Sequence, residues 1–267
     1  SVTLRTLSMA DKRGPALEML RAILSQPQFP AAVFDREQAR SISALKEALT
    51  RPDAIASKAF WAAMYVAHPY GRYATPESVS SLARADVVAF HAAHYTAQRA
   101  TVAIVGDLSR AQAESVAEQL TVGLPSGPAM AGVVLPKLPS GGEQRIAHPA
   151  VQAHLLLGMP ALRRGDPDFF PLLVGNYSLG GGGFVSRLMK EVRDKRGLAY
   201  SVHSYFMPLQ QLGPFQIGLQ TKKAQANDAL KVTREVLATF LAEGPSETEL
   251  QAAKQNLIGS FPLRLDS

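Results

Sequence analysis

The order of secondary-structure elements predicted at the start of this chain recurs in its second half. Alternating polar and apolar residues predict a strand at 1–8, and helical spacing then predicts two helices separated by Pro27. From Pro214 onward the same order returns: a strand, a helix, the breaker Gly244-Pro245 and a final helix. Two dipeptides recur at one common offset, Ala16-Leu17 as Ala229-Leu230 and Gln38-Ala39 as Gln251-Ala252. These coincidences indicate an internal duplication, and therefore two related domains in tandem.

The two copies of the predicted repeat cover different portions of the repeated domain. In the second copy, a strand at 152–159 and helices near 169–178 and 184–195 precede the repeated order. In the first copy, the chain continues past the repeated order to a further strand at 101–105. We therefore expect both domains to be incomplete, with the missing counterparts before residue 1 and after Ser267.

Helix ends give well-defined local predictions. Pro15 is expected in the first turn of a helix, where its missing N–H group costs nothing. Apolar stripes predict further helices at 32–49 and 225–242. Ser246 and Glu249 have the spacing of a capping box, in which a hydroxyl and a carboxylate satisfy N–H groups at the helix start. They predict the beginning of the last helix.

One stretch has the composition of a linker. Residues 123–143 are rich in Gly, Pro and Ser. The predicted division is therefore the C-terminal part of a first domain at 1–122, a linker at 123–143, and the N-terminal part of a second domain at 144–267. Each half mixes strands with paired helices, and few strands are followed by a single crossover helix. This pattern favours an α+β fold of two tandem homologous α/β sandwich domains, with antiparallel-rich sheets and paired helices.

Composition excludes several classes of site. Cysteine is absent, which excludes disulfides, a thiol nucleophile and cysteine-bound metals. The formal net charge is +6, but the basic residues are scattered, and the densest stretch, 190–196, also contains Glu191 and Asp194. That pattern is typical of a solvated helix face, so we expect no nucleic-acid partner. No apolar run reaches the roughly 18 residues that span a bilayer, so we expect no membrane span.

Two histidines, His91 and His94, have a spacing that can place them on one face of a helix, as in some zinc sites. A zinc hydrolase also needs a third ligand and a general base. The nearest upstream acid, Asp86, lies more than one turn away and is the expected N-cap. Because the chain also lacks H-x-x-E-H and H-E-x-x-H, we interpret the pair as histidines that close a helix.

Four consecutive glycines at 180–183 are the most unusual local feature. Glycine loses the most backbone entropy on folding, so such a run needs a reason. A flexible turn between helices and a loop closely approached by a bound peptide both fit it. Downstream, Arg193 and Tyr200 are either an exposed helix cation and a strand tyrosine, or donors aimed at a carbonyl and its oxyanion.

The sequence around these residues resembles a known family. Residues 179–204, LGGGGFVSRLMKEVRDKRGLAYSVHS, closely resemble the signature of the second domain in the pitrilysin/insulinase zinc peptidases, which include the mitochondrial processing peptidases and many bacterial zinc proteases. Three further segments resemble the first domain of that family: FDREQAR at 34–40, HPYG at 68–71 followed by Thr75, and YTAQRATVAIVGD at 95–107. The resemblance covers nearly the whole chain in one order and implies two homologous α+β domains in tandem.

The resemblance implies that the zinc site of active members lies in the first domain. There an inverted H-x-x-E-H helix supplies two histidine ligands and the base glutamate, and a later helix supplies a third ligand. In this chain the later helix corresponds to 32–49, and the ligand position falls on Ala44, which cannot coordinate a metal. A shift of three residues would bring Glu47 into play. The H-x-x-E-H helix would lie before residue 1, so we expect no metal or other cofactor in this chain.

The resemblance also implies roles for residues of the second domain. In active members an arginine and a tyrosine from this domain reach the substrate at the zinc, and by register they match Arg193 and Tyr200. The glycine-rich loop, important for substrate binding in noncatalytic processing-peptidase subunits, matches Gly180, Gly181, Gly182 and Gly183. We therefore expect a noncatalytic subunit that pairs with a zinc-bearing family member as a heterodimer, lends it the Arg/Tyr pair and helps to enclose an extended peptide.

Two other interpretations stay open. One is a purely structural or binding homologue, like the family members that are built into respiratory complexes. The other is an active zinc endopeptidase that uses Glu47 or another acid as a ligand and has its H-x-x-E-H helix upstream. Bacterial relatives of this kind are often exported, which favours a periplasmic location.

Overall fold

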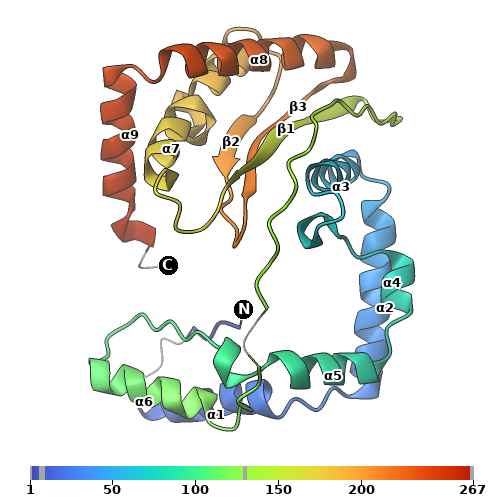
Figure 1. The fold of residues 1–267 in the computed structure, drawn as a ribbon, viewed down its shortest axis with the longest axis vertical. Helices are drawn as coiled ribbons and strands as arrows, with labels where there is room; N and C mark the ends of the chain where they lie inside the picture. Colours follow the sequence, from blue (N-terminus) through green and yellow to red (C-terminus); the bar gives the residue numbers. More distant parts are fainter. Residues whose placement is uncertain (1, 6–9, 129–130, 265–267) are drawn as a thin grey trace. The chain divides into compact units, whose positions relative to one another are not determined.

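The computed structural model describes residues 2–5, 10–128 and 131–264, drawn as a ribbon in Figure 1. Helices and a small antiparallel sheet together form an α+β fold, which confirms the predicted class. The chain divides into two compact units, Ser1–Leu45 with Ala74–Gly132, and Lys46–Tyr73 with Val133–Ser267. The linker at 123–143 and the duplication stay predictions.

The first unit is helical in its described residues. It contains most of α2 and all of four other helices: α1 (Ala10–Ser25), α2 (Ala31–Ala48), α4 (Pro76–Ser80), α5 (Arg84–His94) and α6 (Arg110–Thr121). Its small core lies between α1 and α6, where Leu17, Val116 and Leu120 are buried. The burial of these side chains is what holds the two helices together.

Helix bounds in the first unit were largely predictable. Helix α2 lies within one residue of the predicted 32–49 at each end. Helix α1 instead begins at Ala10, so Pro15 lies inside it and not in its first turn; the helix continues through the proline although one N–H group is missing. The N-cap of α5 is Ala83, and Asp86 is the third residue of the helix. The Asp86 carboxylate accepts the N–H of Ala83 at 2.7 Å, so it caps the helix start from inside the first turn.

The two strands predicted in the first unit are not observed. Residues 2–5 and 101–105 have no strand structure, and residues 1 and 6–8 lie outside the described part of the chain. Strand structure requires hydrogen bonds to a neighbouring strand, and among the described residues neither segment pairs with one. Alternation of polar and apolar side chains is therefore not sufficient to predict a strand in these two segments.

The second unit holds the sheet. Its principal elements are α3 (Pro52–Met64), β1 (Gln152–Leu162), α7 (Phe169–Asn176), β2 (Val202–Phe206), β3 (Gly213–Lys222), α8 (Ala226–Glu243) and α9 (Glu247–Ser260). The strand order is β1-β3-β2 with both pairs antiparallel. The predicted strand at 152–159 and helix at 225–242 are confirmed, and Ser246 caps α9 as expected.

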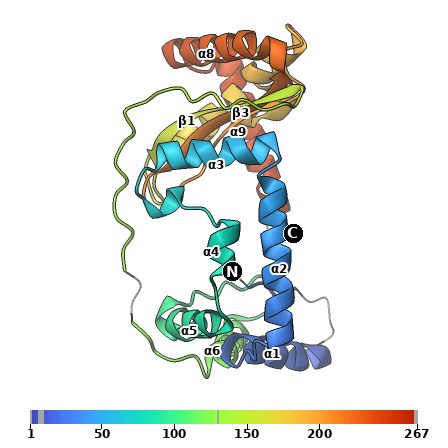
Figure 2. The ribbon, with the colours of Figure 1, turned by 90° about the vertical axis from the view of Figure 1, so that its right-hand side faces the viewer.

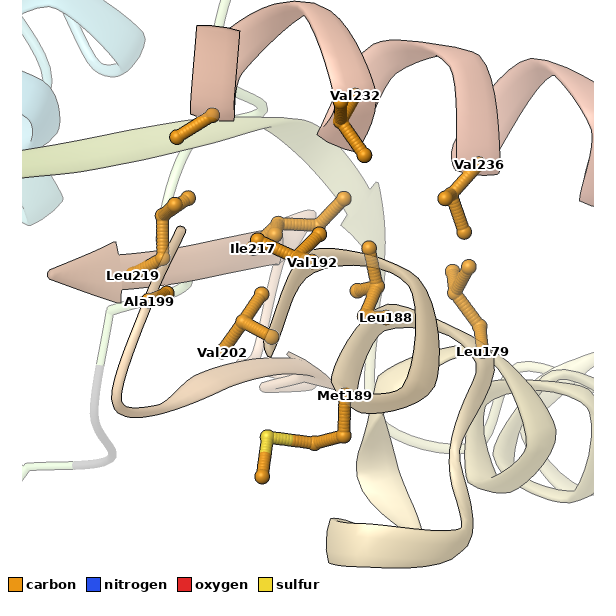
Figure 3. Close-up of a cluster of buried hydrophobic side chains, with 11 residues drawn as sticks. Leu179, Leu188, Met189, Val192, Ala199, Val202, Ile217, Leu219, Val232 and Val236 are labelled. Carbon is orange, nitrogen blue, oxygen red and sulfur yellow. The ribbon is translucent and has the colours of Figure 1, made fainter. Parts of the chain in front are cut away.

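One face of the sheet builds the core of this unit. Ile217 and Leu219 of β3 project into it, and Val202 lies beside Leu219 in the register of β2. Helix α8 and the segment around Leu188 and Val192 cover this face, as the close-up in Figure 3 shows. Alternation along the strands places these apolar side chains together, so the strand period sets which face is buried.

Helix α3 covers the opposite face of the sheet. A Cβ added at Gly158 of β1 would lie 2.8 Å from the ring of Phe60 in α3, so the glycine lets the helix pack closely on the strand. Figure 2 shows the sheet between α8 and α3. The second unit is thus a three-layer arrangement of helix, sheet and helix.

Candidate functional site

The glycine run lies in a compact turn between two helical segments of the second unit. Helix α7 continues into a π-helical turn, η3 (Tyr177–Gly181), which is closed by a hydrogen bond of 2.8 Å from the N–H of Gly182 to the carbonyl of Tyr177. A 3-10 turn, η4 (Gly183–Val185), follows. The next helix begins at Arg187 and ends as a second π-helical segment, η5 (Met189–Asp194). The predicted helices near 169–178 and 184–195 thus exist, but π-helical turns modify both.

Three of the four glycines are required by the packing of the chain on itself. An added Cβ would meet Ser204 N at 2.7 Å from Gly180, Asn176 Nδ2 at 2.6 Å from Gly181, and Tyr177 O at 2.7 Å from Gly182. Gly183 differs, since its φ is +60° and no atom lies within 4 Å of its Cβ position. The run is therefore a packed turn in which a Cβ has free space only at Gly183, although Gly181 is also exposed.

Buried hydrogen bonds fasten this turn to strand β2. The amide of Asn176 donates to the carbonyl of Ser204 at 3.0 Å, and the Ser204 hydroxyl donates back to the Asn176 side-chain oxygen. The fully buried Ser186 donates its hydroxyl to the carbonyl of Gly183 at 2.7 Å. Such buried, mutually satisfied polar groups specify one conformation.

The structure brings Arg193 and Tyr200 together and adds a third residue. The guanidinium carbon of Arg193 lies 5.7 Å from the ring centroid of Tyr200 and 5.0 Å from that of Phe184. Tyr200 is 84% exposed and Phe184 is 69% exposed. Phe184 was not predicted, because a separation of nine residues from Arg193 predicts no contact. The one signal in the sequence was a large aromatic residue directly after the glycine run.

The charged stretch around Arg193 is paired internally. Arg193 donates to Asp194 at 3.0 Å, while Glu191 accepts from Lys195 at 2.6 Å and from Arg196 at 2.7 Å. The hydrogen bonds from Lys195 and then Arg196 lower the pKa of Glu191. These contacts offset part of the positive charge of a segment in which four cations, counting the exposed Lys190, face two carboxylates. The expectation of no nucleic-acid partner stays a prediction.

A second arginine of the same segment has a structural role. Arg187 donates to Glu249 of α9 through Nε at 2.8 Å and Nη2 at 2.7 Å, and also to the carbonyl of Gly244 at 2.9 Å. Its guanidinium carbon lies 5.3 Å from the ring centroid of Phe240. The bonds from Arg187 lower the pKa of Glu249 to about 2. This bidentate pair ties the segment after the glycine turn to α9.

Comparison with known proteins identifies the family. Residues 81–257 match the family model described as the peptidase M16 inactive domain. The chain belongs to the M16 peptidase family. The resemblance to pitrilysin/insulinase-type zinc peptidases is thereby confirmed, and so is the α+β fold.

Three similar proteins illustrate the match. An uncharacterized zinc protease of Mycobacterium leprae is 32% identical over 249 residues, covering 88% of this chain and 54% of the relative. The mitochondrial-processing peptidase subunit beta of Blastocladiella emersonii is 27% identical, covering 94% and 56%. A crystal structure of a peptidase M16 inactive domain from Pseudomonas fluorescens has a TM-score of 0.92 at 39% identity, covering 96% and 62%. The chain thus spans about half the length of the relatives it matches in sequence.

Neither the position of Ala44 nor the pair His91 and His94 forms a zinc site in the described part of this M16 chain. Ala44 offers only a methyl group, and among the described residues no group of three or more His, Asp, Glu or Cys side chains is placed to hold a metal ion. His91 Nε2 instead bonds the carbonyl of Leu24 at 2.9 Å, in keeping with a histidine that closes a helix. In the part of the chain that the structure describes, no helix is long and apolar enough to cross a membrane.

Proposed function

We propose that this chain is a noncatalytic M16 subunit that lends Arg193 and Tyr200 to the active site of a zinc-bearing family member. The observation that carries the proposal is the pairing of these two side chains on an exposed surface, 5.7 Å apart from guanidinium carbon to ring centroid. The match to the inactive-domain model supports it, as does the relative named as a processing-peptidase subunit. The partner is a separate protein, and the assembly is a heterodimer.

The two side chains have the chemistry that peptide hydrolysis requires. A guanidinium carries five N–H donors, and Arg193 uses one of its terminal nitrogens on Asp194, which leaves donors for a substrate carbonyl or its oxyanion. The Tyr200 phenol is free to donate or accept, since its side chain is almost fully exposed. The zinc of the partner would supply Lewis-acid activation of the carbonyl and of water.

The glycine turn has a narrower role in peptide binding than the resemblance implies. A side chain would collide with the chain at Gly180, Gly181 and Gly182, so of the two exposed glycines, Gly181 and Gly183, only Gly183 has free space on its Cβ side for a ligand backbone. Gly183 is followed directly by Phe184, which lies against Arg193. We propose that an extended peptide passes Gly183 on its way to the Arg/Tyr pair.

Reconstitution with a partner tests the proposal. The full-length protein is mixed with an H-x-x-E-H family member from the same organism, and cleavage of fluorogenic peptides is measured. We expect Arg193→Ala to lower kcat by about 100-fold, as for loss of one oxyanion donor, and Tyr200→Phe to lower it by a smaller factor. Lys190→Ala is the matched control, since Lys190 is an exposed cation of the same segment that touches neither ring.

The outcomes separate the proposal from its alternatives. An unchanged rate in both the Arg193→Ala and Tyr200→Phe mixtures would refute the shared site. Stoichiometric zinc and peptide cleavage in the full-length protein alone would show an active peptidase. An inactive mixture, with stable association of the two proteins, would show a structural subunit.

A further inference from the structure

Phe184 is a large apolar side chain held out in solvent beside Arg193. It is 69% exposed, although a phenylalanine normally gains stability by burial. Its ring is nonetheless engaged, because the guanidinium carbon of Arg193 lies 5.0 Å from the ring centroid. Phe184 is not among the side chains that pack in the hydrophobic core of this unit.

The local backbone holds Phe184 in this position. Ser186 donates both its N–H, at 3.0 Å, and its hydroxyl, at 2.7 Å, to the carbonyl of Gly183, which closes the 3-10 turn around Phe184. Ser186 has no exposed surface, so these bonds are shielded from water. Gly183 adopts a φ of +60°, which a residue with a side chain rarely adopts. The outward direction of Phe184 is therefore built into the turn.

Arg193 consequently contacts two aromatic rings from different segments. The ring of Phe184 comes from the turn before the helix, and the ring of Tyr200 comes from the segment before β2. A carboxylate, Asp194, takes one N–H at 3.0 Å. Three contacts on one guanidinium limit the directions in which its remaining donors can point.

We infer that Phe184 is a positioning residue, which together with Tyr200 clasps the Arg193 guanidinium and fixes the direction of its free donors. The inference rests on the proposed function, in which those donors meet the substrate. A cation over an aromatic ring at an exposed site contributes modestly, so the loss of one ring is expected to lower kcat by about two- to fivefold. Because Phe184 acts through Arg193, the Michaelis constant stays nearly unchanged.

Side-chain NMR of the full chain tests the clasp without a partner. The Nε–Hε resonance of Arg193 is followed in protein labelled with ¹⁵N-arginine. Phe184→Leu removes the ring current and loosens the guanidinium, so the resonance is expected to shift and its order to fall; Phe184→Tyr restores both. Val185→Ala is the control, since Val185 is also exposed and makes no ring contact with Arg193. An unchanged Arg193 resonance in Phe184→Leu overturns the inference.

A double-mutant cycle in the reconstituted mixture tests the consequence for activity. Phe184→Leu is expected to lower kcat in the wild-type background and to have no further effect in the Arg193→Ala background. An equal effect in both backgrounds overturns the positioning role. If Arg193→Ala itself leaves the rate unchanged, the proposed function fails, and the NMR result then shows separately that the clasp exists or does not. A thermal melt of each variant verifies folding.

Discussion

Replacing Glu249 with glutamine tests how the segment after the glycine turn is held to α9. The carboxylate accepts bonds from Arg187 at 2.8 and 2.7 Å, and the two side chains are only 22% and 20% exposed. These bonds lower the pKa of Glu249 from 4.5 to about 2. Such a shift corresponds to at most ~3 kcal/mol. Because solvent still screens the pair, we expect Glu249→Gln to lose about 1–2 kcal/mol of unfolding free energy at pH 7.

The pH dependence of this loss follows from the direction of the shift. A carboxyl whose pKa is depressed by folding stabilises the folded state above its unfolded pKa and loses that contribution as the pH falls. The difference between wild type and Glu249→Gln should therefore be full at pH 7 and should shrink from about pH 5 toward pH 2. Urea unfolding followed by circular dichroism at pH 7, 5 and 3 measures it.

Glu247→Gln provides the matched control. Glu247 lies in the same first turn of α9, so both substitutions remove one negative charge near the helix N-terminus. The Glu247 carboxylate accepts a hydrogen bond from the Gln251 amide at 2.7 Å, within the same helix. Equal losses in the two variants, or a difference for Glu249→Gln that does not shrink between pH 5 and pH 3, would refute the reasoning.

Two further predictions concern the turn itself and are checked by thermal and urea unfolding. Gly180→Ala should lose about 3 kcal/mol of unfolding free energy, the upper end of the usual cost of overpacking, because its Cβ would collide with the backbone of Ser204. Gly183→Ala should lose only about 1–2 kcal/mol, from its positive φ. A loss for Gly180→Ala no larger than that for Gly183→Ala would contradict the packing argument. Asn176→Ala should lose about 1–3 kcal/mol, since the buried Ser204 carbonyl and hydroxyl lose their partner. A loss below ~0.5 kcal/mol would show that water replaces the amide.

Local sequence signals predicted the helices of this chain well. The bounds of α2 and α8 lie within one residue of their predictions, and Ser246 with Glu249 marks the start of α9. Each of these features depends on residues a few positions apart, which the sequence displays directly. The strand predicted at 101–105 is wrong because a strand depends on a distant partner that alternation does not reveal.

The candidate site was predictable only in part, for the same reason. Arg193 and Tyr200 were found through a family resemblance, and their contact is a product of the fold. Phe184 was missed because cation–ring geometry has no sequence spacing of its own. The glycine run was recognised as unusual, but the atoms that demand its first three glycines belong to residues 176, 177 and 204. Only the structure could show that the close approach is internal.

An arginine that completes another subunit's active site should be ordered before the subunits meet. Ordering a free, long side chain on association would cost roughly 0.5–1.5 kcal/mol of binding free energy. In this chain Phe184, Tyr200 and Asp194 already restrain Arg193, and the packed glycines hold the turn that presents Phe184. The glycine run therefore supports the proposed site mainly by allowing the turn that presents Phe184 to pack closely on the rest of the chain. Its inner members should affect stability and activity together, whereas substitution of Gly183 should lower peptide affinity beyond its effect on stability.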